Sequence, residues 1–168
     1  MENKKFVKGD LEVADIYECH PHIEAYWREI MPQSDVVTDP SKLENYFLAR
    51  FADDINQRKL YWAIVNSERV GFVTLTIADN KQKATIDDFY ILPSFRRRGF
   101  GTAVMQAIYQ HLDTFQIEQI DLNVRRDTPQ ALKFWEAQGF RIAHYQMRQY
   151  RDPNTGTSFI GALSSDFS

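Results

Sequence analysis

The spacing of hydrophobic residues changes near residue 60 and divides this sequence into two parts. Before that point, apolar residues recur every three or four positions, which places them on one face of a helix. Two runs show this spacing: Ile23, Tyr26, Trp27 and Ile30, followed by Leu43, Phe47, Phe51 and Ile55. The first run predicts a helix that begins with Pro21, because proline suits a first helical position. The second predicts a helix that follows an Asp39 cap and Pro40.

The segments around these two helices carry a weaker pattern. Lys4–Lys8 is expected to be a short strand, and Gly9–Asp10 the turn that follows it. Leu11–Cys19 fits a helix and an extended chain equally well. Gln33–Thr38, which lies between the two helices, is polar and is expected to be a loop.

From residue 60 onward, β-branched and aromatic residues alternate with polar ones, which is the period of a half-buried strand. Two short turns, Asn66–Arg69 and Ala78–Gln82, interrupt this pattern. Strands joined by such short connections run antiparallel. The sequence therefore predicts an antiparallel meander of three strands, which are Leu60–Val65, Val70–Ile77 and Ala84–Leu92.

The chain then returns to helical spacing. A helix is expected after Gly99, with one apolar face made of Phe100, Val104, Ile108 and Leu112. The next strand, Ile117–Val124, is reached through that helix. This order favours a parallel crossover between Ala84–Leu92 and Ile117–Val124.

The remaining residues predict a last helix and two closing strands. Thr128–Pro129 is expected to cap the helix, and Gly139 to follow its end. Arg141–Tyr150 and Ser158–Leu163 have the pattern of strands. No internal repeat or linker interrupts this order. We therefore expect residues 1–168 to form a single mixed α/β domain, with helices beside a mostly antiparallel sheet.

Composition narrows the class of protein without pointing to an activity. A chain of 168 residues with 14% aromatic and 26% charged residues can bury a substantial core. The net charge of −3 argues against a dedicated nucleic-acid binder. Cys19 is the single cysteine, and His20 and His22 lack an evident third ligand, so we expect neither disulfides nor a metal site. No apolar run forms a leader or a membrane span, so a cytoplasmic protein is expected.

One stretch, Asp87–Thr102, carries the most specific chemistry in the sequence. It has the pattern of a strand, a basic loop and the start of a helix. Gly99 and Gly101 allow the backbone to approach a ligand closely, and successive N–H groups there form an anion cradle with the helix N-terminus. The guanidinium groups of Arg96–Arg98 add positive charge. The stretch suits a pyrophosphate-bearing cofactor, and a solvated basic turn explains these residues alone equally well.

The same stretch resembles the GNAT superfamily of acyl-CoA-dependent N-acyltransferases. The cofactor motif of that family is Arg or Gln, two residues, Gly, one residue, and Gly or Ala, and it stands here as Arg96–Gly101. The preceding Phe89–Pro93 is similar to the strand and proline that lead into the motif. Ala131–Phe140 is similar to the last helix of the family and its Gly-Phe exit. The resemblance extends from Leu60 to Tyr150.

The resemblance implies a GNAT-like fold, in which a parallel strand pair splays apart, and two functional parts. Residues from about 10 to 57 supply acceptor-site helices, and residues from about 60 to 150 supply the cofactor-binding core. Acetyl-CoA is expected to bind with its pyrophosphate in the Arg-Gly loop and its pantetheine arm along an open strand edge. The residues implied in cofactor binding are Phe89, Ile91, Arg96, Arg97, Arg98, Gly99, Phe100, Gly101, Thr102, Thr128 and Trp135.

The resemblance further implies acetyl transfer to the primary amine of a small molecule, by direct attack while both substrates are bound. The backbone N–H of Ile91 is expected to stabilise charge on the carbonyl oxygen. Asp87 is expected to be a base or an amine anchor. Asp88 is expected to accept structural hydrogen bonds, because adjacent strand residues face opposite sides. A carboxyl group with a pKa of about four needs a raised pKa or a water relay to act as a base.

Two positions depart from the family's pattern. Trp135 stands where many members carry Tyr, and an indole N–H has no acidic proton to give to a leaving thiolate. Tyr90 and Tyr145 are candidate substitutes, and Thr128 stands where the family has Asn. Three functions therefore stay open: a small-molecule N-acetyltransferase, a protein lysine or N-terminal acetyltransferase, and a non-catalytic acyl-CoA-binding domain. A homodimer is compatible with each of them.

Overall fold

The structure, a computed structural model, describes residues 7–51, 58–80, 82–147 and 149. The chain forms two compact units, Met1–Leu122 and Asn123–Ser168. In the described parts of both units, no helix has the length and apolar character needed to cross a bilayer.

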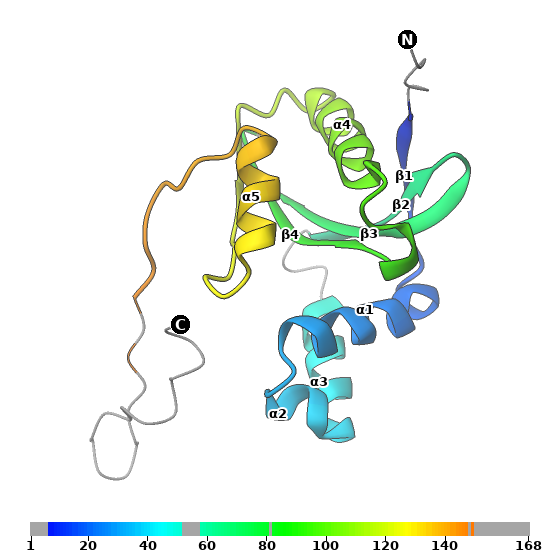
Figure 1. The fold of residues 1–168 in the computed structure, drawn as a ribbon, viewed down its shortest axis with the longest axis vertical. Helices are drawn as coiled ribbons and strands as arrows, with labels where there is room; N and C mark the ends of the chain where they lie inside the picture. The colour runs from blue at the N-terminus through cyan, green and yellow to red at the C-terminus, as the bar shows by residue number, and fades with distance from the viewer. Residues whose placement is uncertain (1–6, 52–57, 81, 148, 150–168) are drawn as a thin grey trace. The chain divides into compact units, whose positions relative to one another are not determined.

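The first unit is built on a five-stranded mixed sheet (Figure 1). The strands lie in chain order, and the first four pair with one another in antiparallel orientation. The last pair is parallel, as expected for a strand reached through a helix. The meander and the crossover are thus confirmed. The strands are β1 (Gly9–Val13), β2 (Arg58–Val65), β3 (Glu68–Ile77), β4 (Lys83–Ile91) and β5 (Gln119–Leu122).

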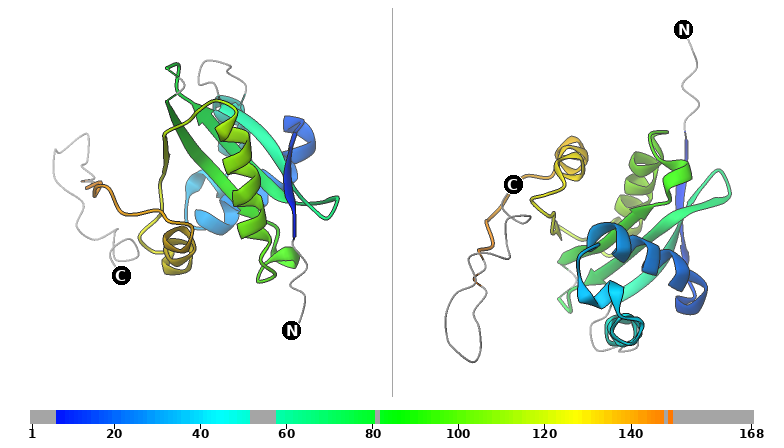
Figure 2. Two further views of the ribbon diagram at one scale, coloured as in Figure 1. Left: turned by 90° about the horizontal axis from the view of Figure 1, so that it is seen from above. Right: turned by 60° about the horizontal axis from the view of Figure 1, so that its bottom comes forward.

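Helices cover both faces of this sheet (Figures 1 and 2). On one face lies α4 (Phe100–Asp113), and its predicted apolar face is buried as expected. On the other face lie three helices that share a core with side chains of β2, β3 and β4. These are α1 (Ile16–Ile30), α2 (Asp35–Thr38) and α3 (Pro40–Phe51). The core on this side contains Cys19, Ile23, Trp27, Val37, Leu43, Phe47, Leu60, Trp62, Phe72 and Tyr90.

The first strand begins where a turn was predicted. Gly9 opens β1, and a Cβ atom at Gly9 would lie 2.3 Å from the carbonyl oxygen of Ala103 in α4. This glycine therefore serves close packing between a strand and a helix, and the predicted Gly9–Asp10 turn is wrong. The predicted Lys4–Lys8 strand lies mostly outside the described residues, and Val7 and Lys8 are not in a strand.

The first helix begins five residues before Pro21. Asp15 caps it, because its Oδ1 accepts hydrogen bonds from the N–H groups of Tyr17 at 2.9 Å and Glu18 at 3.0 Å. Pro21 therefore lies inside the helix, where it removes one backbone hydrogen bond. The prediction that Pro21 starts the helix is wrong, because the Asp15 cap determines the start.

The segment between the long helices is more regular than expected. Gln33–Thr38, predicted to be a loop, contains the short helix α2, which Ser34 caps through a bond from the Val36 N–H at 3.2 Å. The start of α3 is confirmed, because Asp39 Oδ1 accepts the Ser41 N–H at 2.9 Å immediately before Pro40. Ile55, predicted at the end of this helix, lies outside the described residues.

The second unit is described by the single helix α5 (Pro129–Ala137) and the residues around it. The helix ends in a Schellman motif, in which Phe140 N–H bonds the Trp135 carbonyl at 3.0 Å and Gly139 N–H bonds the Glu136 carbonyl at 3.0 Å. Gly139 has a φ of 95°, which confirms its expected place after the helix.

The chain after this helix departs from the prediction. Residues 141–147 form no strand, so the predicted Arg141–Tyr150 strand is wrong over the residues that the structure describes. A strand needs a partner, and no strand is present among the described residues of the second unit to pair with it. The predicted Ser158–Leu163 strand lies outside the described residues.

Candidate functional site

A β-bulge in β4 shapes the first part of the site. Thr74 of β3 pairs with Asp88, whereas the next residue, Leu75, pairs with Ile86. Asp87 is therefore an extra residue in β4 that has no partner position in β3. Such an insertion changes which side chains face each side of the sheet.

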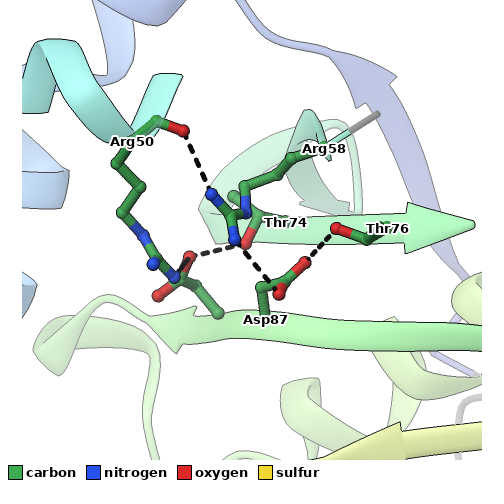
Figure 3. A network of polar contacts seen from close by, with 6 residues as sticks. Arg50, Arg58, Thr74, Thr76 and Asp87 are labelled. Carbon is green, nitrogen blue, oxygen red and sulfur yellow. Dashed lines mark hydrogen bonds and ion pairs between the residues drawn. The ribbon is translucent and has the colours of Figure 1, made fainter. Parts of the chain in front are cut away.

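Asp88 is held deep against the sheet. Its Oδ2 accepts hydrogen bonds from the Thr74 hydroxyl at 2.5 Å and from the Arg50 Nη2 at 2.8 Å. The Asp88 side chain is only 5% exposed. Arg50 comes from α3, so this ion pair ties the helical face to the bulge (Figure 3).

Asp87 is held less tightly and closer to solvent. Its Oδ2 accepts the Thr76 hydroxyl at 2.6 Å, and its Oδ1 lies 3.4 Å from the Arg58 Nη2. Arg58 in turn donates from Nη1 to the Arg50 carbonyl at 3.1 Å (Figure 3). The Asp87 side chain is 15% exposed, which is three times the exposed fraction of Asp88.

The two carboxylates lie on one face of the sheet. Thr74 and Thr76 are two residues apart in β3, so their side chains point to the same face, and they bond Asp88 and Asp87 respectively. The expectation that neighbouring Asp87 and Asp88 face opposite sides is therefore wrong. The bulge is the physical reason, because it breaks the alternation between these two residues.

The outer edge of β4 forms the second part of the site. The ladder with β5 ends at Ile86 and Leu122, whereas β4 continues to Ile91. Leu92 N–H donates to the Val70 carbonyl at 2.8 Å, which makes Gly71 and Ile91 a non-hydrogen-bonded pair. The N–H and C=O of Ile91 therefore point away from β3, and those of Phe89, two residues earlier, point the same way.

The loop after β4 forms the third part. A 3₁₀ turn over Pro93–Phe95 leads into Arg96 and then into two left-handed residues, Arg97 with φ 61° and Gly99 with φ 77°. When left-handed residues alternate with residues of other conformations, successive backbone N–H groups point toward one side of the loop. Gly101 has no left-handed φ and lies within the helix.

The start of α4 faces the same loop. Gly99 is its N-cap, no side chain caps this end, and the first hydrogen bond within the helix runs from Ala103 N–H to the Gly99 carbonyl at 3.2 Å. A Cβ atom on Gly99 would meet no atom within 4 Å, so the space beside it is open. An uncapped helix N-terminus next to open space is suited to an anion.

The three arginines of the loop have different surroundings. Arg96 donates to Glu29 of α1 from both terminal nitrogens and to the Ile91 carbonyl from Nε, each at 2.8 Å. The Arg98 guanidinium lies 4.7 Å from the centre of the Phe100 ring. The Arg97 side chain is exposed. The loop therefore does not present three equivalent guanidinium groups.

The other predicted residues of this region lie at the start of α4. The Phe100 ring is buried, so only its backbone can face a ligand at the loop. The Thr102 side chain is exposed in the first turn of the helix.

Tyr90, a candidate acid, lies in β4, is buried, and donates a hydrogen bond from its hydroxyl to Glu29 at 3.2 Å.

Two predicted cofactor residues belong to the second unit. Trp135 is 8% exposed, and its ring lies 4.9 Å from that of Phe134 and 5.4 Å from that of Phe140. Thr128 precedes α5, and its hydroxyl donates to the Arg125 carbonyl at 2.8 Å instead of capping the helix. Tyr145, the other candidate acid, is exposed.

The described residues show no group of three or more His, Cys, Asp or Glu side chains arranged to hold a metal ion. His20 Nε2 lies 3.7 Å from Glu44 Oε2, and its ring packs on Phe47. The His22 ring packs on Trp62. Both histidine rings therefore pack on aromatic side chains of the core shared with α1 and α3.

Five residues of the site were not predicted from the sequence. They hold the carboxylates of the bulge or the first arginine of the loop, and they are Glu29, Arg50, Arg58, Thr74 and Thr76. Thr74 and Thr76 carry a weak signal, because two polar residues two apart in a buried strand need buried partners. The other three are ordinary charged residues in the sequence and carry no such signal.

Comparisons with known proteins agree with this architecture. The sequence model of the acetyltransferase (GNAT) family matches residues 21–140. A search of curated protein sequences finds no match.

Several solved structures share the fold. YycN from Bacillus subtilis, solved as a candidate acetyltransferase, has a TM-score of 0.68 and 17% identity, over 85% of this chain and 98% of its own. An aminoglycoside acetyltransferase from an uncultured soil metagenomic sample, in complex with sisomicin, has a TM-score of 0.60 and 17% identity, over 88% and 99%. The ribosomal-protein-alanine N-acetyltransferase of Brucella melitensis has a TM-score of 0.58 and 18% identity, over 87% and 99%.

Proposed function

Because this chain belongs to the acetyltransferase (GNAT) family, we propose that it transfers an acetyl group from acetyl-CoA to the primary amine of a small molecule. The observation that carries the proposal is the uncapped start of α4, placed directly after the outer edge of β4. The amine attacks the thioester carbonyl while both substrates are bound, so proximity supplies much of the rate enhancement.

The loop and the start of α4 hold the pyrophosphate of coenzyme A. The residues fit such a group, because the left-handed Arg97 and Gly99 orient N–H groups beside an uncapped helix end and open space. The backbone N–H groups of Phe100 and Gly101 belong to this cradle. The guanidinium groups of Arg97 and Arg98 add positive charge at the rim. The exposed Thr102 hydroxyl adds a hydrogen-bond donor.

The outer edge of β4 receives the pantetheine arm. The N–H and C=O of Phe89 and the C=O of Ile91 point to this edge, and an amide-bearing chain can approach them as an added strand, which leaves the Ile91 N–H for the thioester. Acetyl-CoA supplies an activated thioester and a thiolate leaving group. The Ile91 N–H stabilises the negative charge that develops on the thioester oxygen. In the second unit, Thr128 and Trp135 remain the proposed contacts to pantetheine on the strength of the family motif alone.

Asp87 receives the amine. Its carboxylate has a longer arginine contact than Asp88, at 3.4 Å against 2.8 Å, and a larger exposed fraction. Thr76 and Arg58 together use only part of its capacity, since an ionised carboxylate has about four acceptor sites. Asp87 thus holds the ammonium form and takes up a proton directly or through water.

A small amine is the first choice of acceptor, and one structural relative fits it: the aminoglycoside acetyltransferase bound to sisomicin. Charge complementarity supports the same choice, because the carboxylate of Asp87 favours a cationic acceptor. The ribosomal-protein-alanine N-acetyltransferase keeps a protein N-terminus as the second candidate.

The test measures thiol release from acetyl-CoA in the presence of a panel of polyamines, amino sugars and amino acids. A parallel panel contains lysine peptides and peptides with free N-termini. We expect saturable turnover with at least one free amine, and thermal stabilisation of the protein by coenzyme A.

Each other outcome selects against the proposal. Turnover with peptides alone identifies a protein acetyltransferase. Stabilisation by coenzyme A without turnover on either panel identifies a non-catalytic acyl-CoA-binding domain. The absence of both stabilisation and turnover refutes the assignment of the loop as a coenzyme A site.

A further inference from the structure

One carboxylate of α1 reaches across to the loop after β4. Glu29 lies in the last turn of α1, and its Oε1 and Oε2 accept the two terminal nitrogens of Arg96, each at 2.8 Å. Two parallel bonds of this kind form the most directional contact that an arginine makes with a carboxylate. The partners are 67 positions apart in sequence, so the fold brings them together.

Arg96 is held from the other side by the strand edge. Its Nε donates to the Ile91 carbonyl at 2.8 Å, and its guanidinium lies 5.2 Å from the centre of the Tyr90 ring. The Tyr90 hydroxyl donates to Glu29 Oε2 at 3.2 Å. Each nitrogen of the guanidinium thus has a protein acceptor, and α1, β4 and the loop meet at this one side chain.

This contact lies immediately before the unusual backbone of the loop. Arg97, the next residue, has a φ of 61°, and Gly99 has a φ of 77°. A side chain such as that of Arg97 disfavours left-handed backbone, so the surrounding structure must hold it there. Arg96 is the residue that anchors the chain on entry to this segment.

We infer that Glu29 is a positioning residue for the coenzyme A loop, and that it acts through Arg96, which is a strut between α1 and β4 and not a phosphate ligand. This inference rests on the proposed function, because it assumes that the loop binds coenzyme A. It adds a residue of α1 to the determinants of cofactor affinity. It also assigns the phosphate contacts to the backbone N–H groups and to Arg97 and Arg98.

An opposite arrangement makes a prediction of opposite sign. If the Arg96 guanidinium binds phosphate and Glu29 merely competes for it, removal of the Glu29 charge releases a cation and tightens coenzyme A binding. If Glu29 positions the loop, the same change weakens binding. The sign of the change therefore separates the two arrangements.

The experiment titrates coenzyme A into the full chain by calorimetry, for the parent and for Glu29→Gln, Arg96→Gln and the double variant. We expect each single variant to weaken binding about three- to tenfold, in line with the coupling that such networks carry. The double variant is expected to bind no more weakly than Arg96→Gln alone, because both changes break one contact. The KM for acetyl-CoA rises by the same factor, whereas kcat with the best amine is unchanged.

Glu24→Gln is the matched control. Glu24 also lies in α1 and pairs with Arg28 at 2.7 Å, without reaching the loop. The Glu24→Gln variant is expected to bind coenzyme A with the affinity of the parent. Its melting temperature is expected to equal that of Glu29→Gln. Tyr90→Phe removes one hydrogen bond to Glu29 and tests the same contact if Glu29→Gln fails to fold. It is expected to weaken binding about twofold to threefold, which is about half the free-energy effect of Glu29→Gln.

Three results overturn the inference. They are tighter binding by Glu29→Gln, an unchanged affinity in Glu29→Gln and Arg96→Gln, and additive effects in the double variant. A parent protein that fails to bind coenzyme A refutes the proposed function itself, so the two failures are distinguishable. A loss of melting temperature in Glu29→Gln with an unchanged KM assigns Glu29 to stability alone.

Discussion

Asp87 and Asp88 are adjacent in β4, yet their carboxylates lie on the same face of the sheet and bond two threonines of the same neighbouring strand. The bulge at Asp87 allows this arrangement. The two carboxylates are nevertheless not equivalent, because Asp88 is deeply buried against Arg50 while Asp87 is closer to solvent. This difference is why we propose a structural role for Asp88 and a chemical role for Asp87.

We predict that Asp87→Asn lowers kcat about a hundredfold or more, the usual cost of losing a positioned acid or base. Its affinity for coenzyme A is expected to stay at the parent value. Steady-state kinetics and calorimetry on the same preparation check both statements.

The companion variant Asp88→Asn tests the structural role. It leaves the partly buried Arg50 guanidinium without the charge of Asp88, so the free energy of unfolding is expected to fall by about 3 kcal/mol. Urea unfolding measures this loss. If Asp88→Asn loses turnover without losing stability, the amine binds at Asp88 and our assignment is wrong.

Gly99→Val is predicted to abolish coenzyme A binding while the protein stays folded. The φ of 77° at Gly99 strains a β-branched residue, and the strain distorts the N–H groups of the loop. No atom lies within 4 Å of a Cβ at this position, so no clash with the core is expected. Gly139→Val is the matched control, because Gly139 has a φ of 95° and equally open space at the end of α5. Equal loss of affinity in both variants would contradict the assignment of the loop.

The Glu29–Arg96 contact predicts a pH dependence. The hydrogen bond from Arg96 lowers the pKa of the Glu29 carboxyl from its ordinary value of 4.5. Burial opposes this shift in part. A carboxyl whose pKa is lower in the folded state contributes stability that is fully present above its unfolded pKa. That contribution is lost as the pH falls through the lower folded pKa. The difference in melting temperature between the parent and Glu29→Gln is therefore expected to be constant from neutral pH down to about pH 5.5 and to shrink below pH 4.5.

The single cysteine is predicted to be inert in the folded protein. Burial raises the pKa of the Cys19 thiol to about 12, so almost no thiolate is present at neutral pH. A disulfide reagent such as DTNB is expected to label Cys19 in guanidinium chloride and not in buffer at pH 8. Rapid labelling of the folded chain would show that α1 opens readily. A silent Cys19 also leaves released coenzyme A as the only thiol signal in the acetyltransferase assay.

The sequence predicted the parts of the fold that depend on local periodicity. The meander follows from alternation between residues 60 and 92, and α4 follows from Phe100, Val104, Ile108 and Leu112, because a regular element shows its buried face at a fixed spacing. The apolar spacing that predicts α1 begins only at Ile23, whereas the Asp15 cap starts the helix a full turn before Pro21. The strand predicted at Arg141–Tyr150, which is absent at residues 141–147, has the alternation of a strand, yet alternation alone does not supply a partner strand.

The candidate site was predictable only where its signal is local. The loop from Arg96 to Gly101 is recognisable because its glycines and arginines are adjacent in sequence. The β-bulge is not recognisable in the sequence, because Asp87 and Asp88 are the same residue type and nothing local shows which of them is the inserted one. The partners Glu29 and Arg50 come from helices far away in sequence, and nothing distinguishes them from other charged helix residues until the chain is folded.

The bulge has a further consequence for how this chain tolerates insertions and deletions. Ile86 pairs with Leu75 and Tyr90 pairs with Phe72, and Phe72 and Tyr90 belong to the core shared with α1 and α3. Asp87 lies between these pairs as an inserted residue that the pairing with β3 does not use. Removing this residue would leave Ile86 opposite Leu75 and Asp88 opposite Thr74, so β4 would become regular and its other side chains would keep their faces. An insertion or deletion elsewhere in the strand would shift the register and turn buried side chains toward the opposite face.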